Sequence, residues 1–277
     1  MDAPDDATGT EPAFAVTPAS GDAGPFVFAS PHSGERLPAD MGADPDLAPG
    51  DLASANDLWM DRLVEAGPRH GAPLIRGLIG RAYLDLNRGP DEWDPQLVDA
   101  PPPGFETGGA KAAAGYGVVH RLTGGGRPLY IRRLDRAEVE RRVARVHGPY
   151  HAALGGLMQA ARGRHGRAVL VDWHSMPGRA GQADVVLGDR HGSSCGRALT
   201  RTLRTLFERQ GLKVALNHPY AGGYSTRLWG RPEAGYEAVQ VEISRSLYVD
   251  PRTGGPSAGY GRCRAALDQV IAGLVGG

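Results

Sequence analysis

Short, largely apolar segments recur along this chain of 277 residues, and helix-forming stretches separate most of them. Apolar runs of this length are typical of strands buried on both faces of a sheet. The expected strands cover residues 26–29, 74–79, 82–86, 168–173, 183–187, 214–216 and 238–243. The expected helices cover residues 52–66, 135–164, 195–210 and 258–274, the second of them bent or broken at Gly148-Pro149. Strands and helices that alternate in this way predict an α/β domain on a mixed, mostly parallel sheet.

The composition is that of an ordinary globular protein, with 41% hydrophobic and 22% charged residues. The 41 glycines and 22 prolines require many tightly turned loops. Residues 89–127 form the longest of these, and a loop of that length in a compact domain is usually functional or mobile. We expect one domain over residues 21–277. Residues 1–20 are acidic and rich in Ala, Thr and Pro, which favours a disordered tail.

The charge balance restricts the class of partner. The 31 basic and 31 acidic residues cancel, whereas nucleic acid or an anionic membrane surface selects for excess positive charge. No stretch approaches the roughly 18 apolar residues of a membrane span, and the N-terminal stretch lacks the pattern of a signal peptide. Cys195 and Cys263 are too few for a disulfide framework. We therefore expect a cytoplasmic protein with a small-molecule partner, and no pattern specifies an oligomeric state.

Polar side chains suited to chemistry stand at the ends of four expected strands. His32 follows the first apolar run, Asn87-Arg88 follow the run 82–86, His174 follows the run 168–173, and Glu242 lies near the end of the run 238–243. In α/β folds, ligands bind beyond the carboxyl ends of the strands. These side chains are therefore expected to converge on one site.

The segment Pro31-His32-Ser33-Gly34-Glu35 carries a His-x-x-Glu pattern directly after a strand. A histidine and a glutamate three residues apart can both reach one cation, and His174 supplies a third ligand. Two histidines and a carboxylate with an open position form a catalytic zinc set, although Mn and Co also suit these ligands. The alternatives are a surface histidine beside a solvated Glu35, and for His174 a core histidine bonded to backbone.

Glu242 stands in the alternating strand Val239-Gln240-Val241-Glu242-Ile243-Ser244. A carboxylate in so apolar a strand is costly unless it has a partner or faces a cleft. We interpret Glu242 as a general base that takes a proton from zinc-bound water and returns it to the leaving amine. The alternative is an outward-facing glutamate on a half-exposed strand.

Substrate-binding candidates surround this set. Asn87 and Arg88 are suited to gripping a carboxylate at two points, unless Arg88 is an ordinary surface arginine paired with Asp91 or Glu92. Arg227, in a glycine-rich run, is a candidate for binding a carboxylate or for stabilising the oxyanion during catalysis. His151 is expected to line the site, with a structural role as the alternative. The other histidines are ranked lower: His147 as structural, His191 and His218 as loop residues that could face the pocket, and His70, His120 and His165 as surface residues.

Six segments taken together resemble the N-formylglutamate amidohydrolase family, in that family's order from about residue 25 to 250. They are Pro31-His32-Ser33-Gly34, Asp85-Leu86-Asn87-Arg88, Pro149-Tyr150-His151, Asp172-Trp173-His174-Ser175, Gly222-Gly223-Tyr224 with Arg227, and Gln240-Val241-Glu242. The family is similar to a wider zinc-carboxypeptidase-like group that includes aspartoacylase and succinylglutamate desuccinylase. That group's pattern of His-x-x-Glu, Asn-Arg, a later His and a catalytic Glu is matched in order by His32, Glu35, Asn87, Arg88, His174 and Glu242.

The resemblance implies a three-layer α/β/α fold and hydrolysis of an N-acyl amide on an acidic amino acid. For N-formyl-L-glutamate the products are formate and L-glutamate, at the end of one route of histidine breakdown. Two other functions stay open on the residues alone. One is a zinc carboxypeptidase or amidase acting on peptide or cell-wall fragments, and the other is a non-catalytic protein that binds a small molecule.

Overall fold

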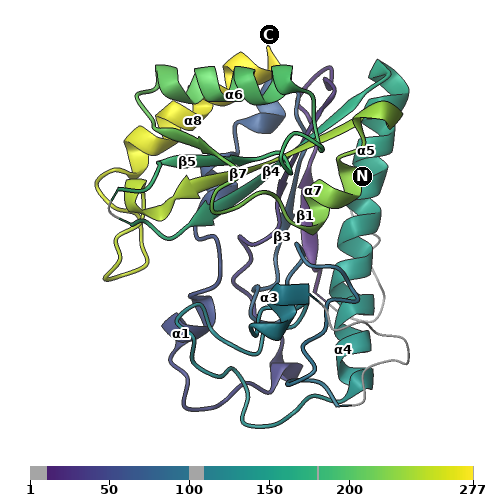
Figure 1. Cartoon of the computed structure of the whole chain (residues 1–277), viewed down its shortest axis with the longest axis vertical. Helices are drawn as coiled ribbons and strands as arrows, with labels where there is room; N and C mark the ends of the chain where they lie inside the picture. Colours follow the sequence, from purple (N-terminus) through teal and green to yellow (C-terminus); the bar gives the residue numbers. More distant parts are fainter. Residues whose placement is uncertain (1–10, 100–108, 180, 277) are drawn as a thin grey trace.

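A computed structural model describes residues 11–99, 109–179 and 181–276 of the chain, and a seven-stranded sheet runs through its centre (Figure 1). The strand order is β1-β3-β2-β4-β7-β5-β6. The pairs β3–β2, β2–β4, β4–β7 and β5–β6 are parallel, and the pairs β1–β3 and β7–β5 are antiparallel. The strands are β1 (Phe14–Thr17), β2 (Phe26–Ser30), β3 (Leu74–Gly77), β4 (Ala168–Met176), β5 (Val185–Gly188), β6 (Val214–Leu216) and β7 (Tyr236–Ser244). The mixed, mostly parallel sheet is therefore confirmed.

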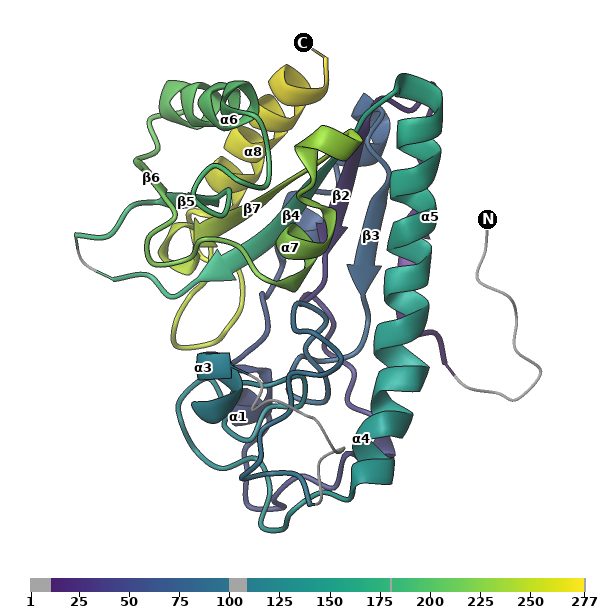
Figure 2. The same cartoon turned by 45° about the vertical axis from the view of Figure 1, so that its right-hand side comes forward.

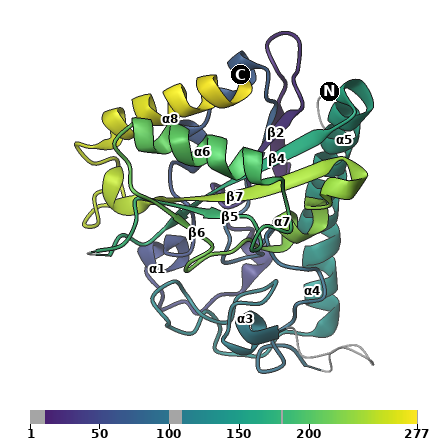
Figure 3. The ribbon, with the colours of Figure 1, turned by 45° about the horizontal axis from the view of Figure 1, so that its top comes forward.

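Helices cover both faces of this sheet, as Figures 2 and 3 show. One face carries a long column of α4 (Arg136–Arg142), a π-helical turn (Val143–His147) and α5 (Gly148–His165). The other face carries α6 (Arg197–Arg209) and α8 (Tyr260–Val275). Short helices lie in the connections: α1 (Pro49–Ala53), α2 (Met60–Leu63), α3 (Gly109–Ala113) and α7 (Tyr224–Trp229), with 3-10 turns at Ala39–Met41, Gly67–His70, Pro232–Ala234 and Arg245–Leu247. The three-layer α/β/α arrangement is thus confirmed.

The alternation of side chains along β4 separates the two layers of the core. Leu170 points toward α5 and packs in the cluster that contains Leu154 and Met158. Its neighbours Val169, Val171 and Trp173 belong to the opposite cluster, which includes Phe207 of α6 and Leu267 of α8. Successive residues of a strand face opposite sides of the sheet, so a strand covered on both faces must be apolar throughout. The continuous apolar run that predicted this strand reflects that double burial.

The helix expected over residues 52–66 is wrong as one element. The chain forms α1 and α2 instead, with an irregular segment between them that contains Asn56 and Asp57. The Asn56 side chain accepts a hydrogen bond from the backbone N–H of Arg81, and the backbone N–H of Asp57 donates to the carbonyl of His32. These tertiary bonds replace the intrahelical ones, because Asn and Asp compete readily with helical hydrogen bonding.

The strand expected over residues 82–86 is also wrong. Tyr83, Leu84 and Leu86 are buried, but the segment is a series of turns without a sheet partner. Among the described residues, its only backbone–backbone hydrogen bond to another segment runs from the Asp85 N–H to the Val118 carbonyl. An apolar run records burial and not hydrogen-bond pattern, so it does not by itself distinguish a strand from a buried loop.

Part of the expected disordered tail is ordered. Phe14–Thr17 form β1, which pairs antiparallel with β3, and the Phe14 ring packs edge-on against Tyr150 of α5. The polar composition of residues 1–20 as a whole concealed this four-residue edge strand. Residues 1–10 of the expected tail lie outside the described residues, and the single domain over 21–277 stays a prediction.

The remaining expected elements are present with small shifts at their ends. The segment 135–164 does not break at Gly148-Pro149, because the π-helical turn carries the chain continuously from α4 into α5. In the part of the chain that the structure describes, no helix is both long and apolar enough to span a membrane.

A glycine allows the turn after β2 to pack against the backbone that follows β3. A Cβ atom on Gly34 would lie 2.4 Å from the backbone carbon of Leu78 and 2.6 Å from the nitrogen of Ile79. We predict that Gly34→Ala lowers the free energy of unfolding by about 1–3 kcal/mol, because backbone must move to admit the methyl group. Urea denaturation measures the change.

Gly156→Ala is the matched control. Gly156 is exposed in the middle of α5, and a Cβ atom added to it would have nothing within 4 Å. This substitution should stabilise the protein by roughly 0.5–1 kcal/mol through helix propensity. Equal effects of the two substitutions would show that the turn tolerates a side chain at Gly34.

Candidate metal centre

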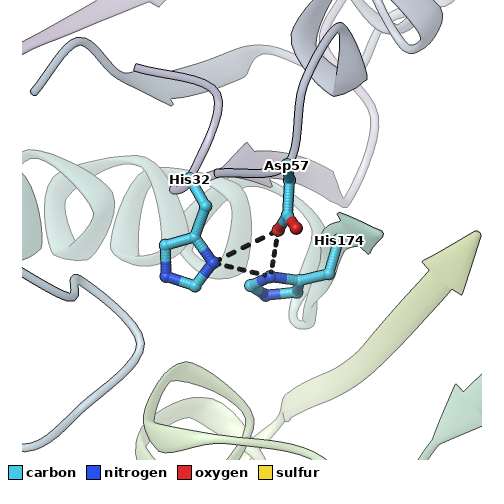
Figure 4. Close-up of side chains that lie close together, drawn as sticks. All are labelled: His32, Asp57 and His174. Atoms are coloured by element: carbon cyan, nitrogen blue, oxygen red, sulfur yellow. Dashed lines mark hydrogen bonds and ion pairs between the residues drawn. The ribbon is translucent and has the colours of Figure 1, made fainter. Parts of the chain in front are cut away.

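Three buried side chains from distant parts of the sequence meet at the carboxyl edge of the sheet (Figure 4). His32 lies on the turn after β2, Asp57 lies between α1 and α2, and His174 lies near the end of β4. Their exposed fractions are 1%, 1% and 3%. His32 Nδ1 is 3.2 Å from Asp57 Oδ2, His174 Nδ1 is 3.0 Å from the same oxygen, and the two Nδ1 atoms are 3.1 Å apart.

This triangle has the dimensions of one face of a metal coordination polyhedron. Ligands about 2.0–2.1 Å from a tetrahedral zinc ion lie roughly 3.3 Å from one another. Two imidazole nitrogens that face each other beside a carboxylate oxygen bring three lone pairs toward one point. A cation between them would compensate this arrangement, so the donor set fits a divalent metal ion.

Contacts on the far side of each ring, and on the second oxygen of Asp57, also orient the three ligand atoms toward a common point. His32 Nε2 donates to Asp85 Oδ1 over 2.7 Å, and His174 Nε2 lies 3.0 Å from Asp172 Oδ2. Ser175 Oγ donates to the second oxygen of Asp57 over 2.8 Å. A carboxylate on Nε2 fixes the proton there and leaves the Nδ1 lone pair free, which is the usual arrangement around metal-bound histidines.

The same contacts shift the pKa values of Asp57 and His174. Burial acts to raise the pKa of Asp57, but hydrogen bonds from His174 and His32 outweigh it and hold that pKa below its ordinary value. Burial acts to lower the pKa of His174, but the charge of Asp172 and the hydrogen bonds to Asp172 and Asp57 raise it well above the ordinary value. A proton on His174 therefore balances the carboxylates when no cation is present.

Glu35 does not belong to this cluster, and its assignment as the third ligand requires correction. Its side chain is exposed, whereas Asp57 stands between the two histidines. The backbone of Gly34 packs against Leu78 and Ile79 after β3, and Arg36 forms a bridge with Ile79, so the chain turns away from the site directly after His32. The sequence signal for Asp57 was the polar pair Asn56-Asp57 inside an apolar helical pattern, where both residues disfavour helix.

Glu242 lies next to the cluster in β7. It pairs in register with His174 of β4, so both side chains point to the same face of the sheet. Its side chain is 5% exposed, and its Oε1 accepts a hydrogen bond from Gln240 Nε2 over 2.7 Å. Burial raises the pKa of Glu242 to about 7. A carboxylate with this pKa can gain and lose a proton at neutral pH, as a general base must.

Asn87 connects these residues. Its Nδ2 donates to Gln240 Oε1 over 3.1 Å and lies 3.2 Å from His174 Nε2, while its Oδ1 accepts from the backbone N–H of Ser225. Asn87 is 4% exposed. Its side-chain hydrogen bonds are thus directed to protein groups of the site.

The other expected substrate-binding residues lie around the same loop. Arg88 donates from Nε to the Tyr116 carbonyl and from Nη1 to the Asn87 carbonyl. Arg227 is 53% exposed, and its Nη2 lies 3.6 Å from Glu92 Oε1. His151 donates from Nε2 to the Leu86 carbonyl.

Three lower-ranked histidines are placed as follows. His191 and His218 are exposed. His120, expected at the surface, is buried, and its Nε2 donates to Asp85 Oδ2 over 3.0 Å. Burial lowers the pKa of His120 to about 4, so it is neutral when it makes this bond.

These observations define a three-layer α/β protein with a buried His–Asp–His cluster and an adjacent glutamate at the carboxyl edge of its sheet. The sequence profile of the N-formylglutamate amidohydrolase family matches residues 24–249. The chain therefore belongs to the N-formylglutamate amidohydrolase family, whose members are hydrolytic enzymes.

Individual relatives agree with this assignment. The chain is 29% identical over 237 residues to the N-formylglutamate deformylase of Pseudomonas aeruginosa and 27% identical over 235 residues to that of Pseudomonas putida, with 82% of each chain covered in both cases. It is also similar to the crystal structure of the N-formylglutamate amidohydrolase from Ralstonia eutropha JMP134. That comparison has a TM-score of 0.90 and 34% identity, and it covers 95% of this chain and 97% of the other.

The two candidate carboxylate ligands can be separated by substitution. We predict that Asp57→Ala lowers bound zinc to near zero after dialysis against a weak chelator, because it removes one corner of the triangle. Glu35→Ala should retain the wild-type metal content, because Glu35 is exposed outside the cluster. Elemental analysis of the purified proteins measures both. Loss of metal only from Glu35→Ala would restore the His-x-x-Glu assignment.

Metal affinity should rise with pH. The proton on His174 must leave before Nδ1 can bind a cation, and the pKa of His174 lies well above its ordinary value. Displacement of one proton predicts about a tenfold gain in affinity per pH unit below that pKa. Chelator competition across neutral pH measures the slope, and Asp172→Asn should flatten it by removing the charge that holds the proton. A pH-independent affinity in the wild-type protein would contradict this coupling.

Proposed function

We propose that the protein hydrolyses the formyl amide bond of N-formyl-L-glutamate to formate and L-glutamate. The observation that carries this proposal is the position of Glu242, a buried carboxylate in register with His174 and beside the candidate metal cluster. The two Pseudomonas relatives are N-formylglutamate deformylases, which supports the choice of substrate.

The protein residues divide the work of amide hydrolysis among them. His32, Asp57 and His174 would hold a divalent cation, zinc being the first choice, with Mn or Co also suited to these donors. When bound, such a cation acts as a Lewis acid toward oxygen atoms of the reactants. Glu242 takes a proton from the attacking water and delivers it to the leaving amine nitrogen. Gln240 holds one oxygen of Glu242, so that the other oxygen is available for proton transfer.

Positive charge around the site suits an acidic substrate. Arg81 and Arg245 donate to the successive carbonyls of Ala55 and Ser54, beside the segment that carries Asp57. Arg88 lies on the loop after Asp85, and Arg227 lies on α7. We propose that Arg88 and Arg227 bind substrate carboxylates, and that Arg227 also stabilises the oxyanion that forms during hydrolysis.

The proposed activity also implies a metabolic role and a location in the cell. Glutamate and formate as products would place the enzyme at the end of a route of histidine breakdown, in the cytoplasm. The substrate is a small molecule, in agreement with the balanced charge of the chain.

A substrate panel on the zinc-loaded protein tests the proposal. We predict release of formate from N-formyl-L-glutamate with a kcat/KM well above that for the acetyl and succinyl analogues or for short peptides. Glu242→Gln keeps the shape of the side chain and removes the base. It should retain metal and lose roughly 10²–10⁴-fold in kcat.

Each failure points to a different conclusion. Preferred cleavage of peptides would favour a carboxypeptidase or amidase. Tight binding of the substrate without turnover, unaffected by chelation, would favour a non-catalytic binding protein. Unchanged kcat in Glu242→Gln would remove Glu242 from the role of base while leaving the substrate assignment intact.

A further inference from the structure

Three consecutive carbonyl groups beside the metal cluster are each held by a different donor. His151 Nε2 donates to the Leu86 carbonyl over 2.8 Å, and His147 Nε2 donates to the Arg88 carbonyl over 2.9 Å. The carbonyl between them, that of Asn87, accepts the backbone N–H of Tyr224 at the start of α7 over 3.3 Å. Because residues 82–86 have no strand partner, these bonds do for the loop what a sheet ladder does for a strand.

The π-helical turn between α4 and α5 presents the two histidines together. His147 ends that turn, His151 follows one helical turn later, and their ring centroids are 4.2 Å apart. The ring of Tyr224 packs against both, at 5.5 and 5.1 Å. π-helical turns are rare, and they occur frequently at functional sites. Here the turn widens the helix at the position where the loop passes.

The loop held in this way contacts both histidines of the metal cluster. Asp85 accepts the Nε2–H of His32, and the Asn87 side chain lies 3.2 Å from His174 Nε2. A shift of the loop along α5 would move the Asp85 acceptor of His32 and the Asn87 side chain that lies against His174. The orientation of the two histidine rings thus depends on where the carbonyls of residues 86 and 88 are fixed.

A carbonyl only accepts, so each of these histidines carries its proton on Nε2. His147 is 3% exposed, and His151 Nδ1 is buried without a hydrogen-bond partner among the described residues. Burial lowers the pKa of His151 to about 4 and also lowers the pKa of His147, which keeps both rings neutral. They are suited to hold a backbone and unsuited to bind a substrate carboxylate as cations.

We propose that His147 and His151 are positioning residues, which fix the Asp85–Arg88 loop and through it the two histidine donors of the metal cluster. The inference rests on the proposed metal centre, and it takes the structural alternative for His151 in place of substrate binding. It assigns no direct contact with the substrate to either ring.

The test measures metal affinity, which is independent of the substrate. His147→Leu and His151→Leu should each weaken zinc binding by about tenfold to a hundredfold, the range found when outer partners of metal ligands are lost. His147→Gln and His151→Gln should restore most of the affinity, because the amide N–H₂ can donate to the same carbonyl. In the metal-loaded enzymes the Leu variants should lower kcat with little change in KM, since the rings do not touch the substrate.

His165→Leu is the matched control. His165 lies at the end of the same helix and donates its Nε2–H to the Ala23 carbonyl, far along the helix from the loop. Its removal costs the same kind of bond and should leave zinc affinity unchanged. In the metal-free protein, histidine ¹⁵N spectra should also show His147 and His151 as Nε2–H tautomers.

The outcomes separate the inference from the proposed function. Equal zinc affinity in the wild-type and Leu variants overturns the positioning role, as does a rise in KM with unchanged kcat, which would indicate direct substrate binding. Weakened zinc binding in a protein that does not cleave N-formylglutamate would uphold the inference and reject the substrate. If the Leu variants fail to fold, the Gln variants provide the test, because they retain a donor to the same carbonyl. A tenfold to hundredfold loss of zinc affinity in the Gln variants would then contradict the positioning role.

Discussion

A single buried carboxylate organises the catalytic edge of the sheet. Asp85 has no exposed surface, and it accepts hydrogen bonds from His32, His120, Arg81 and its own loop at the Asn87 N–H. Burial acts to raise its pKa, but the charge of Arg81 and the bonds from the histidines hold that pKa well below its ordinary value. An ionised carboxylate in this place is tolerable only because every lone pair is used. Asp85 therefore ties the β2 turn, the 82–88 loop and the long 89–127 excursion to one point.

The residues that could be predicted from the sequence are those whose placement follows from a strand. His32, His174 and Glu242 terminate or lie in apolar runs, and parallel strands bring their carboxyl ends to one edge, which is where the structure brings them together. The two helical layers follow from the same double burial of the strands. These inferences need only the period of the side chains and the direction of the chain.

The residues that could not be predicted depend on tertiary contacts of irregular backbone. Asp57 enters the site because its N–H meets the carbonyl of His32, and no local pattern records that bond. Glu35 has the spacing of a ligand, yet the close packing of Gly34 on the backbone after β3 directs it outward. The 82–86 segment has the apolar character of a strand, but its last carbonyl accepts a hydrogen bond from His151 of α5 and not from a neighbouring strand. A motif gives the order of residues, whereas the direction of a turn is decided by what packs beneath it.

The charge balance of the site connects its structure to its chemistry. Asp57, Asp85, Asp172 and Glu242 are all buried around the two histidines, and Arg81 is the guanidinium that neutralises Asp85. The protein can relieve the remaining negative charge by raising the proton affinity of His174 and Glu242, and the pKa of both groups is raised. A divalent cation at the triangle would take over this role and release the proton from His174. It would also favour the ionised form of Glu242. Binding of one cation would therefore free His174 Nδ1 to act as a ligand and put Glu242 in the form that accepts a proton.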